Sequence, residues 1–333
     1  MKVVELQTFT LDSLAVAERP QPSPGPGQVL IRVRACSLNY RDLLVLKGLY
    51  NKKLPLPLVP LSDGAGEVAA VGDGVTRVRV GDRVAGCFMP AWIDGEPTEA
   101  KAKSALGGGG TGILAEYVVL PAEGVVSYPD HLSAEEAATL PCAAVTAWHA
   151  LVAEGGVKAG DVVLTQGTGG VSLFALQFAR LLGARVLATS SSDAKLARAV
   201  QLGASDGINY KTTPEWGGRA RELTGAGVDH VVEVGGAGTM PESMRAVRMG
   251  GRISLIGVLS GAGQFNPTPV LMKNLRVQGI FVGSREMFEA MNRAIALHKL
   301  RPVVDRVFPM SDIRAALHHL ESGAHFGKVV IRV

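Results

Sequence analysis

Cysteine is scarce in this 333-residue sequence, which contains only Cys36, Cys87 and Cys142. The three are widely spaced and odd in number, so no disulfide framework is predicted. This excludes the small disulfide-stapled secreted domains and favours a reducing cytoplasm. Residues 1–5 lack the apolar segment of a secretion signal, and we therefore expect no export.

Long hydrophobic runs and clusters of basic residues are also lacking. No apolar stretch approaches the roughly 18 residues needed to cross a bilayer, so no membrane segment is expected. The formal charge of +4 is spread along the chain, without a run of five or more basic residues. This spread argues against a nucleic-acid partner and favours a small molecule or a phosphate group as the use of a few cations.

Aromatic residues make up only 5% of the chain, whereas hydrophobic residues reach 47% and glycine occurs 41 times. The length exceeds an ordinary single domain and fits two. The hydrophobic share supplies a large core and excludes a disordered or fibrous chain. The many glycines favour an α/β protein with glycine at its strand-to-helix junctions.

The pattern of elements changes near residue 130. Before it, short strands bounded by turn residues are predicted at 29–35, 64–72 and 81–86. The polar segment 90–112 is predicted to be irregular, with a flexible glycine run at 107–110. At the change itself, Ser133 and Glu136 form the capping box that opens a helix.

Apolar strands and amphipathic helices then alternate, which predicts a doubly wound parallel sheet. Strands are expected at 161–165, 185–190, 207–210, 228–233, 252–256 and 277–282, and helices at 172–182, 193–202 and 240–249. The tail beyond residue 284 is predicted to be mostly helical. Its closing strand, 328–333, needs a sheet partner, which we expect in the first domain.

A glycine-rich turn marks the predicted cofactor site. The strand at 161–165 leads into Gly167, Gly169 and Gly170, and a helix follows at once. Such glycines let the backbone approach a pyrophosphate at the positive end of the helix. Ser172 stands where the usual fingerprint has a third glycine, and it is small enough to keep the helix close to the strand. The order of elements predicts a dinucleotide site.

The second strand of this unit indicates which dinucleotide binds. An NAD enzyme usually ends this strand with an acid that binds the ribose 2′-hydroxyl. Here the strand ends in Ser190 and Ser191, and Lys195 follows. Hydroxyl donors and a cation suit a 2′-phosphate, so NADPH is favoured over NADH. Asp193 keeps NADH open, and Lys195 also fits a solvated helix face.

Taken together, these motifs resemble the medium-chain dehydrogenase/reductase family, in its zinc-independent quinone oxidoreductase-like branch. The resemblance is carried by residues 24–30, 39–42, 64–68, 81–84, 167–172, 234–236 and 326–330. It implies a GroES-like β-rich catalytic domain over 1–127 and 284–333, around a Rossmann domain at 128–283, with the active cleft between them. It also implies a homo-oligomer, a dimer or tetramer, for which residues 275–282 offer a sheet edge.

Zinc members of the family place a cysteine near Asn39 and a Gly-His-Glu sequence where this chain has Ser62 and Asp63. Only Cys142 keeps a position that implies a ligand, and one soft ligand with one carboxylate does not make a three-ligand site. Residues 90–112 lack the four cysteines of a structural zinc site. We therefore expect no metal. A zinc-dependent alcohol dehydrogenase with ligands at other positions is the alternative.

The resemblance implies hydride transfer from NADPH to a quinone or an α,β-unsaturated carbonyl. The candidate catalytic residues are Tyr50, as a proton donor or a rim aromatic, together with Asn39 and Tyr40. Asn39 either orients the acceptor or satisfies a turn, and Asp42 is expected to be a scaffold carboxylate. The implied cofactor contacts are Thr146, Gly167, Gly169, Gly170, Val171, Ser190, Ser191, Lys195, Tyr210, Gly235, Ile256, Phe281 and Lys328. A second alternative is a redox sensor or structural protein that binds NADPH without turnover.

Overall fold

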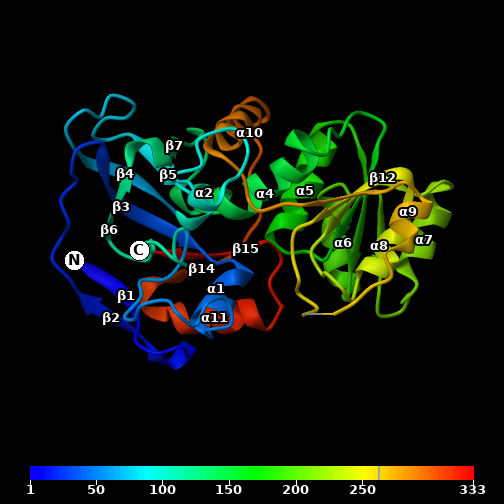
Figure 1. The fold of residues 1–333 in the computed structure, drawn as a ribbon, viewed down its shortest axis with the longest axis horizontal. Helices are drawn as coiled ribbons and strands as arrows, with labels where there is room; N and C mark the ends of the chain where they lie inside the picture. The colour runs from blue at the N-terminus through cyan, green and yellow to red at the C-terminus, as the bar shows by residue number, and fades with distance from the viewer. Residues whose placement is uncertain (262) are drawn as a thin grey trace. The chain divides into compact units, whose positions relative to one another are not determined.

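The computed structural model describes residues 1–261 and 263–333, which divide into two compact units (Figure 1). The first unit joins the two ends of the chain, Met1–Val145 and Gly283–Val333, and the second is Thr146–Val282. Within the described ranges, no helix is both long and apolar enough to cross a membrane.

The first unit is built on a mostly antiparallel sheet. Its strand order is β14-β15-β3-β4-β5-β7, and β6 also pairs with β3. A separate hairpin pairs β1 with β2. The strands are β1 (Lys2–Leu6), β2 (Leu14–Glu18), β3 (Gln28–Ser37), β4 (Asp63–Val71), β5 (Arg83–Gly86), β6 (Tyr117–Pro121), β7 (Val125–Ser127), β14 (Val304–Pro309) and β15 (Lys328–Arg332). The short strands predicted at 29–35, 64–72 and 81–86 correspond to β3, β4 and β5.

The carboxyl-terminal strand finds its partner at the other end of the chain. Residues Val330, Ile331 and Arg332 of β15 pair antiparallel with β3, and Figure 1 shows the red β15 beside the blue β3. This confirms the expectation that strand 328–333 pairs within the first domain. The other neighbour of β15 in the sheet is β14. The sequence beyond residue 284 was predicted to be mostly helical before its closing strand, and β14 was not predicted.

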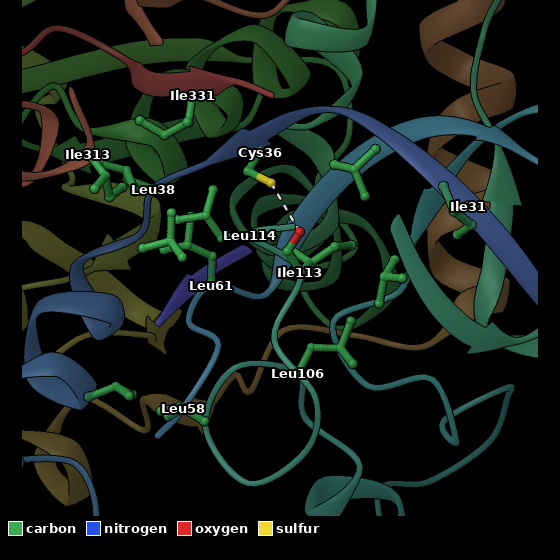
Figure 2. Close-up of a cluster of buried hydrophobic side chains, with 14 of the residues drawn as sticks. Ile31, Cys36, Leu38, Leu58, Leu61, Leu106, Ile113, Leu114, Ile313 and Ile331 are labelled. Atoms are coloured by element: carbon green, nitrogen blue, oxygen red, sulfur yellow. Dashed lines mark hydrogen bonds between the residues drawn. The ribbon is translucent and has the colours of Figure 1, made fainter. Parts of the chain in front are cut away.

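Apolar side chains from distant segments form the core of this unit (Figure 2). The Cys36 thiol belongs to this core and donates to the carbonyl oxygen of Ile113 at 3.5 Å. Each fully buried aliphatic side chain contributes about 1.5–3 kcal/mol, so the cluster stabilises the unit strongly. Members labelled in Figure 2 include Ile31 from β3, Ile331 from β15, Ile313 from the helix α11 (Ile313–Glu321), and Leu61 and Leu106 from connecting segments.

Helices of the first unit begin where the sequence places caps. Ser133 and Glu136 form the predicted capping box at α3 (Ala134–Ala137). The segment 90–112 includes a short helix, α2 (Glu99–Lys103), and three of its glycines, Gly107, Gly108 and Gly112, are closely packed. A methyl group at Gly107 would lie 2.4 Å from the Leu61 carbonyl oxygen, and one at Gly108 would lie 1.9 Å from the Arg41 guanidinium. These glycines therefore permit close contacts. The remaining helices are α1 (Tyr40–Leu46) and α10 (Arg285–His298).

The second unit is a six-stranded, fully parallel sheet of order β10-β9-β8-β11-β12-β13. The chain moves outward from β8 to β10 and then returns to β11, so the winding reverses between β8 and β11. Ligands bind at such reversal points in open parallel sheets. The strands are β8 (Val162–Gln166), β9 (Arg185–Ser190), β10 (Asp206–Asn209), β11 (Val228–Glu233), β12 (Val247–Leu255) and β13 (Arg276–Gly279).

Helices connect the strands of this unit, and one of them is shorter than predicted. The predicted helix at 240–249 ends at Ala246, where β12 begins with the buried Val247. Gly250 has a φ of +68°, which no helix accommodates, and Val247 pairs with Val228 of β11. The helices are α4 (Val145–Trp148), α5 (Gly170–Leu181), α6 (Asp193–Gln201), α7 (Trp216–Thr224), α8 (Met240–Ala246) and α9 (Thr268–Met272).

We predict that Gly66→Ala lowers the free energy of unfolding by about 3 kcal/mol. A methyl group at Gly66 of β4 would lie 2.0 Å from the Arg32 carbonyl oxygen of β3, so the strands would have to separate. Urea unfolding measures the change. Gly109→Ala is the matched control, because its methyl group would lie 3.8 Å from the nearest atom. Equal stability of the two variants would contradict the prediction.

Candidate functional site

Five predicted cofactor residues form a row along one edge of the parallel sheet. Gly167, Ser190, Tyr210, Gly235 and Ile256 lie at or just after the carboxyl ends of β8, β9, β10, β11 and β12. Backbone hydrogen bonds continue the sheet register there, from Tyr210 to Ser190 at 3.0 Å and from Gly167 to Thr189 at 2.8 Å. Because all strands run in the same direction, residues far apart in sequence meet at this edge.

The turn after β8 leaves the start of α5 open. Gly167 has a φ of +69°, a left-handed conformation that favours glycine. Gly169 is the N-cap of α5 and makes no side-chain capping bond, and a methyl group there would meet nothing within 4 Å. The Ser172 hydroxyl donates to the Gln166 carbonyl oxygen at 2.6 Å, which ties the helix to the strand. The positive end of this 12-residue helix thus faces open space, as an anion site requires.

Hydroxyl groups end the second strand. Ser190 is buried at the end of β9, and its oxygen accepts from the backbone N–H of Ser192 at 3.3 Å. Ser192 caps α6, which carries Lys195 in its first turn. The carboxylate of Asp193 accepts from the Asn209 amide at 2.8 Å. Asp193 is the only acidic residue in the segment 190–195, and its carboxylate is therefore already hydrogen-bonded within the protein.

A buried carboxylate holds the next turn of the edge. Glu233 ends β11 and is fully buried. One of its oxygens accepts from the backbone N–H groups of Gly235 at 2.7 Å and Gly236 at 2.9 Å, and from the Thr239 hydroxyl at 2.6 Å. The other accepts from the Gln166 amide at 2.7 Å and from the Ser243 hydroxyl. Glu233 therefore joins the turn that carries Gly235 to the end of β8.

The structure distributes the remaining predicted cofactor residues over both units. Thr146 is buried in α4, Val171 lies in the first turn of α5, and Ser191 follows β9. Phe281 is 44% exposed beyond β13. Lys328 belongs to the first unit.

Lys328 and Asn39 form the centre of a polar cluster in the first unit. The Lys328 ammonium is buried and donates to the Leu38 carbonyl oxygen and to Asn39 Oδ1, both at 2.5 Å. Its Nζ also lies 4.0 Å from Oδ2 of the fully buried Asp63. Because Asn39 Oδ1 accepts from Lys328, the amide nitrogen points elsewhere. That nitrogen is buried and has no hydrogen-bond partner among the described residues.

Both carboxylate oxygens of Asp63 accept hydrogen bonds from protein groups. Its Oδ1 accepts from the Ser62 hydroxyl at 2.7 Å, and its Oδ2 accepts from the Ser37 hydroxyl at 3.4 Å and the Cys142 backbone N–H at 3.3 Å. Burial, reinforced by the Asp63 charge, raises the pKa of the Cys142 thiol. The metal-free thiol therefore stays protonated.

Arg41 places Tyr50 beside this cluster. The Arg41 guanidinium lies 5.0 Å from the Tyr50 ring centroid and 4.6 Å from that of Phe88, and it donates to the Leu106 carbonyl oxygen at 2.9 Å. Its Nε and second terminal nitrogen are buried and have no partner in the described part of the chain. Buried polar groups are normally satisfied, so such groups indicate where a ligand binds. Tyr50 itself is 42% exposed.

Asp42 serves as the scaffold carboxylate that was expected. Its Oδ2 accepts from the Asn39 backbone N–H at 2.7 Å at the start of α1. Burial raises the pKa of Asp42 to about 6, although the positive charge of Arg41 opposes the shift. Tyr40, the third candidate catalytic residue, is 47% exposed at the start of α1.

Comparison with known proteins identifies the family. The family described as "Alcohol dehydrogenase GroES-like domain" matches residues 25–130, and "Zinc-binding dehydrogenase" matches residues 170–296. A zinc-type alcohol dehydrogenase-like protein of Schizosaccharomyces pombe is 48% identical, over 92% of this chain and 91% of its own length. The chain belongs to the medium-chain dehydrogenase/reductase superfamily. It is therefore an oxidoreductase, and its GroES-like and Rossmann-type units are those that the resemblance implied.

Solved structures of similar medium-chain dehydrogenases share the fold along the whole chain. An NAD-dependent alcohol dehydrogenase is 38% identical with a TM-score of 0.91, and all of both chains is covered. A mycobacterial protein whose structure contains NADPH is 29% identical with a TM-score of 0.84, again over all of both chains.

Two functional positions lie outside the sequence predictions. Arg41 lies within the motif at 39–42, and its guanidinium contacts the Tyr50 ring. Glu233 ends a predicted strand. The signal that marks it is a carboxylate directly after the apolar pair Val231 and Val232 at the end of that strand, because a charge is seldom buried without partners.

Glu233→Gln is expected to lower the free energy of unfolding by about 3 kcal/mol. Glutamine would direct an amide N–H₂ at donors that now share a carboxylate, leaving buried groups unsatisfied. Thermal or urea unfolding measures the loss. Glu222→Gln is the control, since Glu222 is exposed on α7 and pairs only with Arg219 at 2.9 Å. A loss no larger than that of the control would show that the network contributes little.

Proposed function

We propose that this medium-chain dehydrogenase transfers hydride from NADPH to a quinone or an α,β-unsaturated carbonyl without a catalytic zinc ion. The observation that carries the proposal is the row at the carboxyl edge of the parallel sheet, where hydroxyl groups stand at the position of the usual acid. The nicotinamide coenzyme supplies the hydride, and the protein supplies orientation and electrostatics.

The residues of the second unit fit a dinucleotide. The open start of α5 and the left-handed Gly167 suit a pyrophosphate, since neither a side chain nor a capping bond fills the space at Gly169. Gly170 and Val171 would extend this contact with backbone N–H groups. Gly235 and Ile256 would line the same edge, and Thr146 and Phe281 would complete the site. The NADPH complex of the mycobacterial relative supports the same assignment.

The end of β9 favours a 2′-phosphate. Ser190 and Ser191 offer hydroxyl donors, Lys195 offers a positive charge, and Tyr210 is bonded through its backbone to Ser190. A carboxylate at Ser190 would repel the phosphate, and the nearby Asp193 is engaged by Asn209. We therefore favour NADPH. Because a similar solved structure is that of an NAD-dependent alcohol dehydrogenase, the preference between the two coenzymes calls for a direct test.

In the first unit, Asn39 and Tyr50 are the groups that we propose bind the acceptor. The Asn39 amide nitrogen is a donor without a protein partner, and Lys328 keeps it oriented by occupying Oδ1. A fixed donor stabilises charge that develops on an acceptor oxygen. The Tyr50 phenol would deliver the proton, with Arg41 holding the ring. Lys328 acts here as a positioning residue. We assign Tyr40 to the rim of the same site.

Zinc does not fit the donors that this cluster offers. Asn39 Oδ1 already accepts from an ammonium group, and both oxygens of Asp63 accept from protein donors. The ammonium of Lys328, 4.0 Å from Asp63, would repel a second cation. Because the matching family is described as "Zinc-binding dehydrogenase", metal analysis of the purified protein must decide whether zinc is bound.

We also propose a homo-oligomer and a reducing compartment. Strand β13 is one of the two edge strands of the parallel sheet and is exposed along its length, so a second copy has free backbone groups to pair with. All three cysteines are free thiols.

Coenzyme preference is tested by Ser191→Asp. The added carboxylate should weaken NADPH binding by about tenfold or more, because it repels the 2′-phosphate, and should leave NADH binding unchanged. Fluorescence titration gives both dissociation constants. Ser191→Asn, of the same shape but neutral, should behave like the parent chain. Equal affinity of the parent for the two coenzymes would contradict the 2′-phosphate assignment.

Turnover is tested by NADPH oxidation with 1,4-benzoquinone and with a 2-alkenal after dialysis against EDTA. We expect activity to persist, zinc to be far below one ion per chain by mass spectrometry, and Cys142→Ser to retain turnover. Stoichiometric zinc with activity lost to the chelator would establish the metal-dependent alternative. Tight NADPH binding with no turnover on either acceptor would establish a sensor.

A further inference from the structure

A charged cavity opens at the edge of the parallel sheet opposite to the cofactor row. It has a volume of about 200 Å³. The residues that line it come from the segment before β8 and from the first halves of β11, β12 and β13. The cofactor row lies beyond the last residues of these strands, so the two sites stand at opposite ends of one sheet. Nothing in the proposed reaction uses this cavity.

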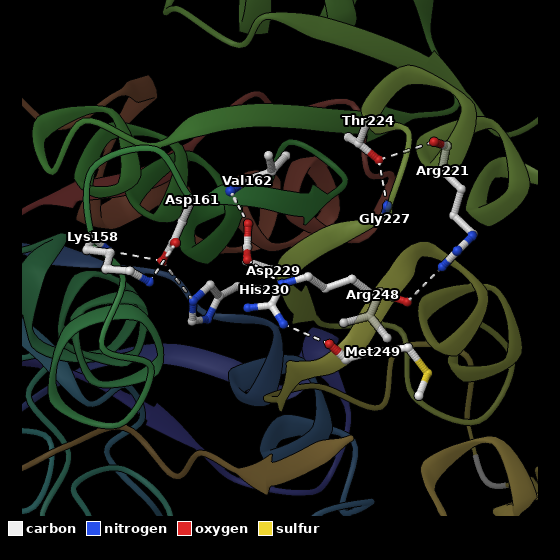
Figure 3. Close-up of polar contacts among 11 residues, drawn as sticks. Lys158, Asp161, Val162, Arg221, Thr224, Gly227, Asp229, His230, Arg248 and Met249 are labelled. Carbon is white, nitrogen blue, oxygen red and sulfur yellow. Dashed lines mark hydrogen bonds and ion pairs between the residues drawn. The ribbon is translucent and has the colours of Figure 1, made fainter. Parts of the chain in front are cut away.

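Cations outnumber carboxylates in the lining. Lys158, Arg248, Arg252 and Arg276 face only two acids, Asp161 and Asp229. Both acids are already engaged within the protein, as Figure 3 shows. Asp161 accepts from Lys158 Nζ at 3.0 Å, and Asp229 accepts from Arg248 Nε at 2.6 Å. Burial opposes ionisation of Asp161, but the hydrogen bonds from Lys158 hold its pKa below the usual range.

Two guanidinium groups remain without an acid. Arg252 donates to the Glu154 carbonyl oxygen at 2.9 Å, which leaves its charge uncompensated. The Arg276 side chain makes no hydrogen bond or ion pair with any described residue, and it lies on the exposed strand β13. Guanidinium groups bind phosphate and carboxylate through two parallel N–H···O bonds. The cavity therefore presents two free cations of the type that best recognises an oxyanion.

His230 also lines the cavity, but it supplies no donor to an anion. The residue is 6% exposed, and its Nε2 lies 3.4 Å from Asp161 Oδ2. Burial lowers the pKa of His230, so the ring is neutral and its proton lies on the nitrogen that faces the Asp161 carboxylate. Nδ1 is then an acceptor, and the cations of the lining are the groups that can bind an oxyanion.

Glycine keeps one side of the cavity free of side chains. Gly156 and Gly250 have φ values of +62° and +68°, and both line the cavity. A methyl group at Gly156 would meet nothing within 4 Å. The volume corresponds to roughly seven water molecules at about 30 Å³ each, which suits a small anion and excludes a dinucleotide.

We propose that this cavity binds a small dianion, inorganic phosphate or a short dicarboxylate, through Arg252 and Arg276. The two guanidinium charges match a dianion. Pairing of β13 with a second copy would use backbone groups of the strand, so the Arg276 side chain keeps its place in the cavity.

The proposal is tested by calorimetric titration of the full chain with inorganic phosphate at low ionic strength, in the presence of saturating NADPH so that the coenzyme site is filled. A parallel titration uses succinate. We expect one saturable site per chain for at least one of the two anions, and which anion binds more tightly identifies the class of ligand. In Arg252→Gln and Arg276→Gln the affinity should fall by about tenfold or more.

The matched control is Arg219→Gln, an exposed arginine on α7 that lies outside the cavity lining. It should bind as the parent chain does. A thermal melt without anion checks that each variant is folded, and added anion should raise the melting temperature of the parent and the control only. Absence of saturable binding of both anions, or binding that survives both arginine substitutions, would overturn the proposal.

Discussion

The arrangement of the turns at the carboxyl edge of the parallel sheet depends on one buried carboxylate. Glu233 accepts five hydrogen bonds, and they come from the end of β8, the turn after β11 and the start of α8. A buried charge is costly unless its hydrogen bonds are complete, and here every lone-pair direction has a donor. The result is a fixed spacing between Gln166 and Gly235. That spacing holds the turn after β11 against the end of β8.

Buried charge is used differently in the first unit. Lys328 and Asp63 approach to 4.0 Å, and each is held by further protein groups. Around this pair, however, the Asn39 amide nitrogen and two nitrogens of Arg41 stay without a partner in the described chain. A complete network stabilises a fold, whereas an incomplete one leaves donors for a ligand. This contrast separates the scaffold of the coenzyme site from the groups that we assign to the acceptor.

A parallel sheet also has two chemically different edges. Backbone and side-chain donors of the turns gather beyond the carboxyl ends of β8, β9 and β11, and the reversal of winding opens the site there. The amino ends of β8, β11 and β12 instead carry charged residues, and there Asp161 pairs with Lys158 and Asp229 pairs with Arg248. Strand β8 has only five residues. Asp161 immediately precedes it and Gly167 immediately follows it, so the two edges of the sheet lie a short strand apart.

Local periodicity and short motifs were enough to predict the family, the parallel sheet and the glycine turn. The need of β15 for a distant partner was also predictable, since a lone strand leaves backbone groups unpaired. The folded chain alone shows that α8 stops at Ala246, that Gly108 makes room for Arg41, and that Glu233 and Lys328 are buried with their particular partners. These depend on contacts between residues tens to hundreds of positions apart. No local pattern reports such contacts, because the same residue types are equally stable on a solvated surface.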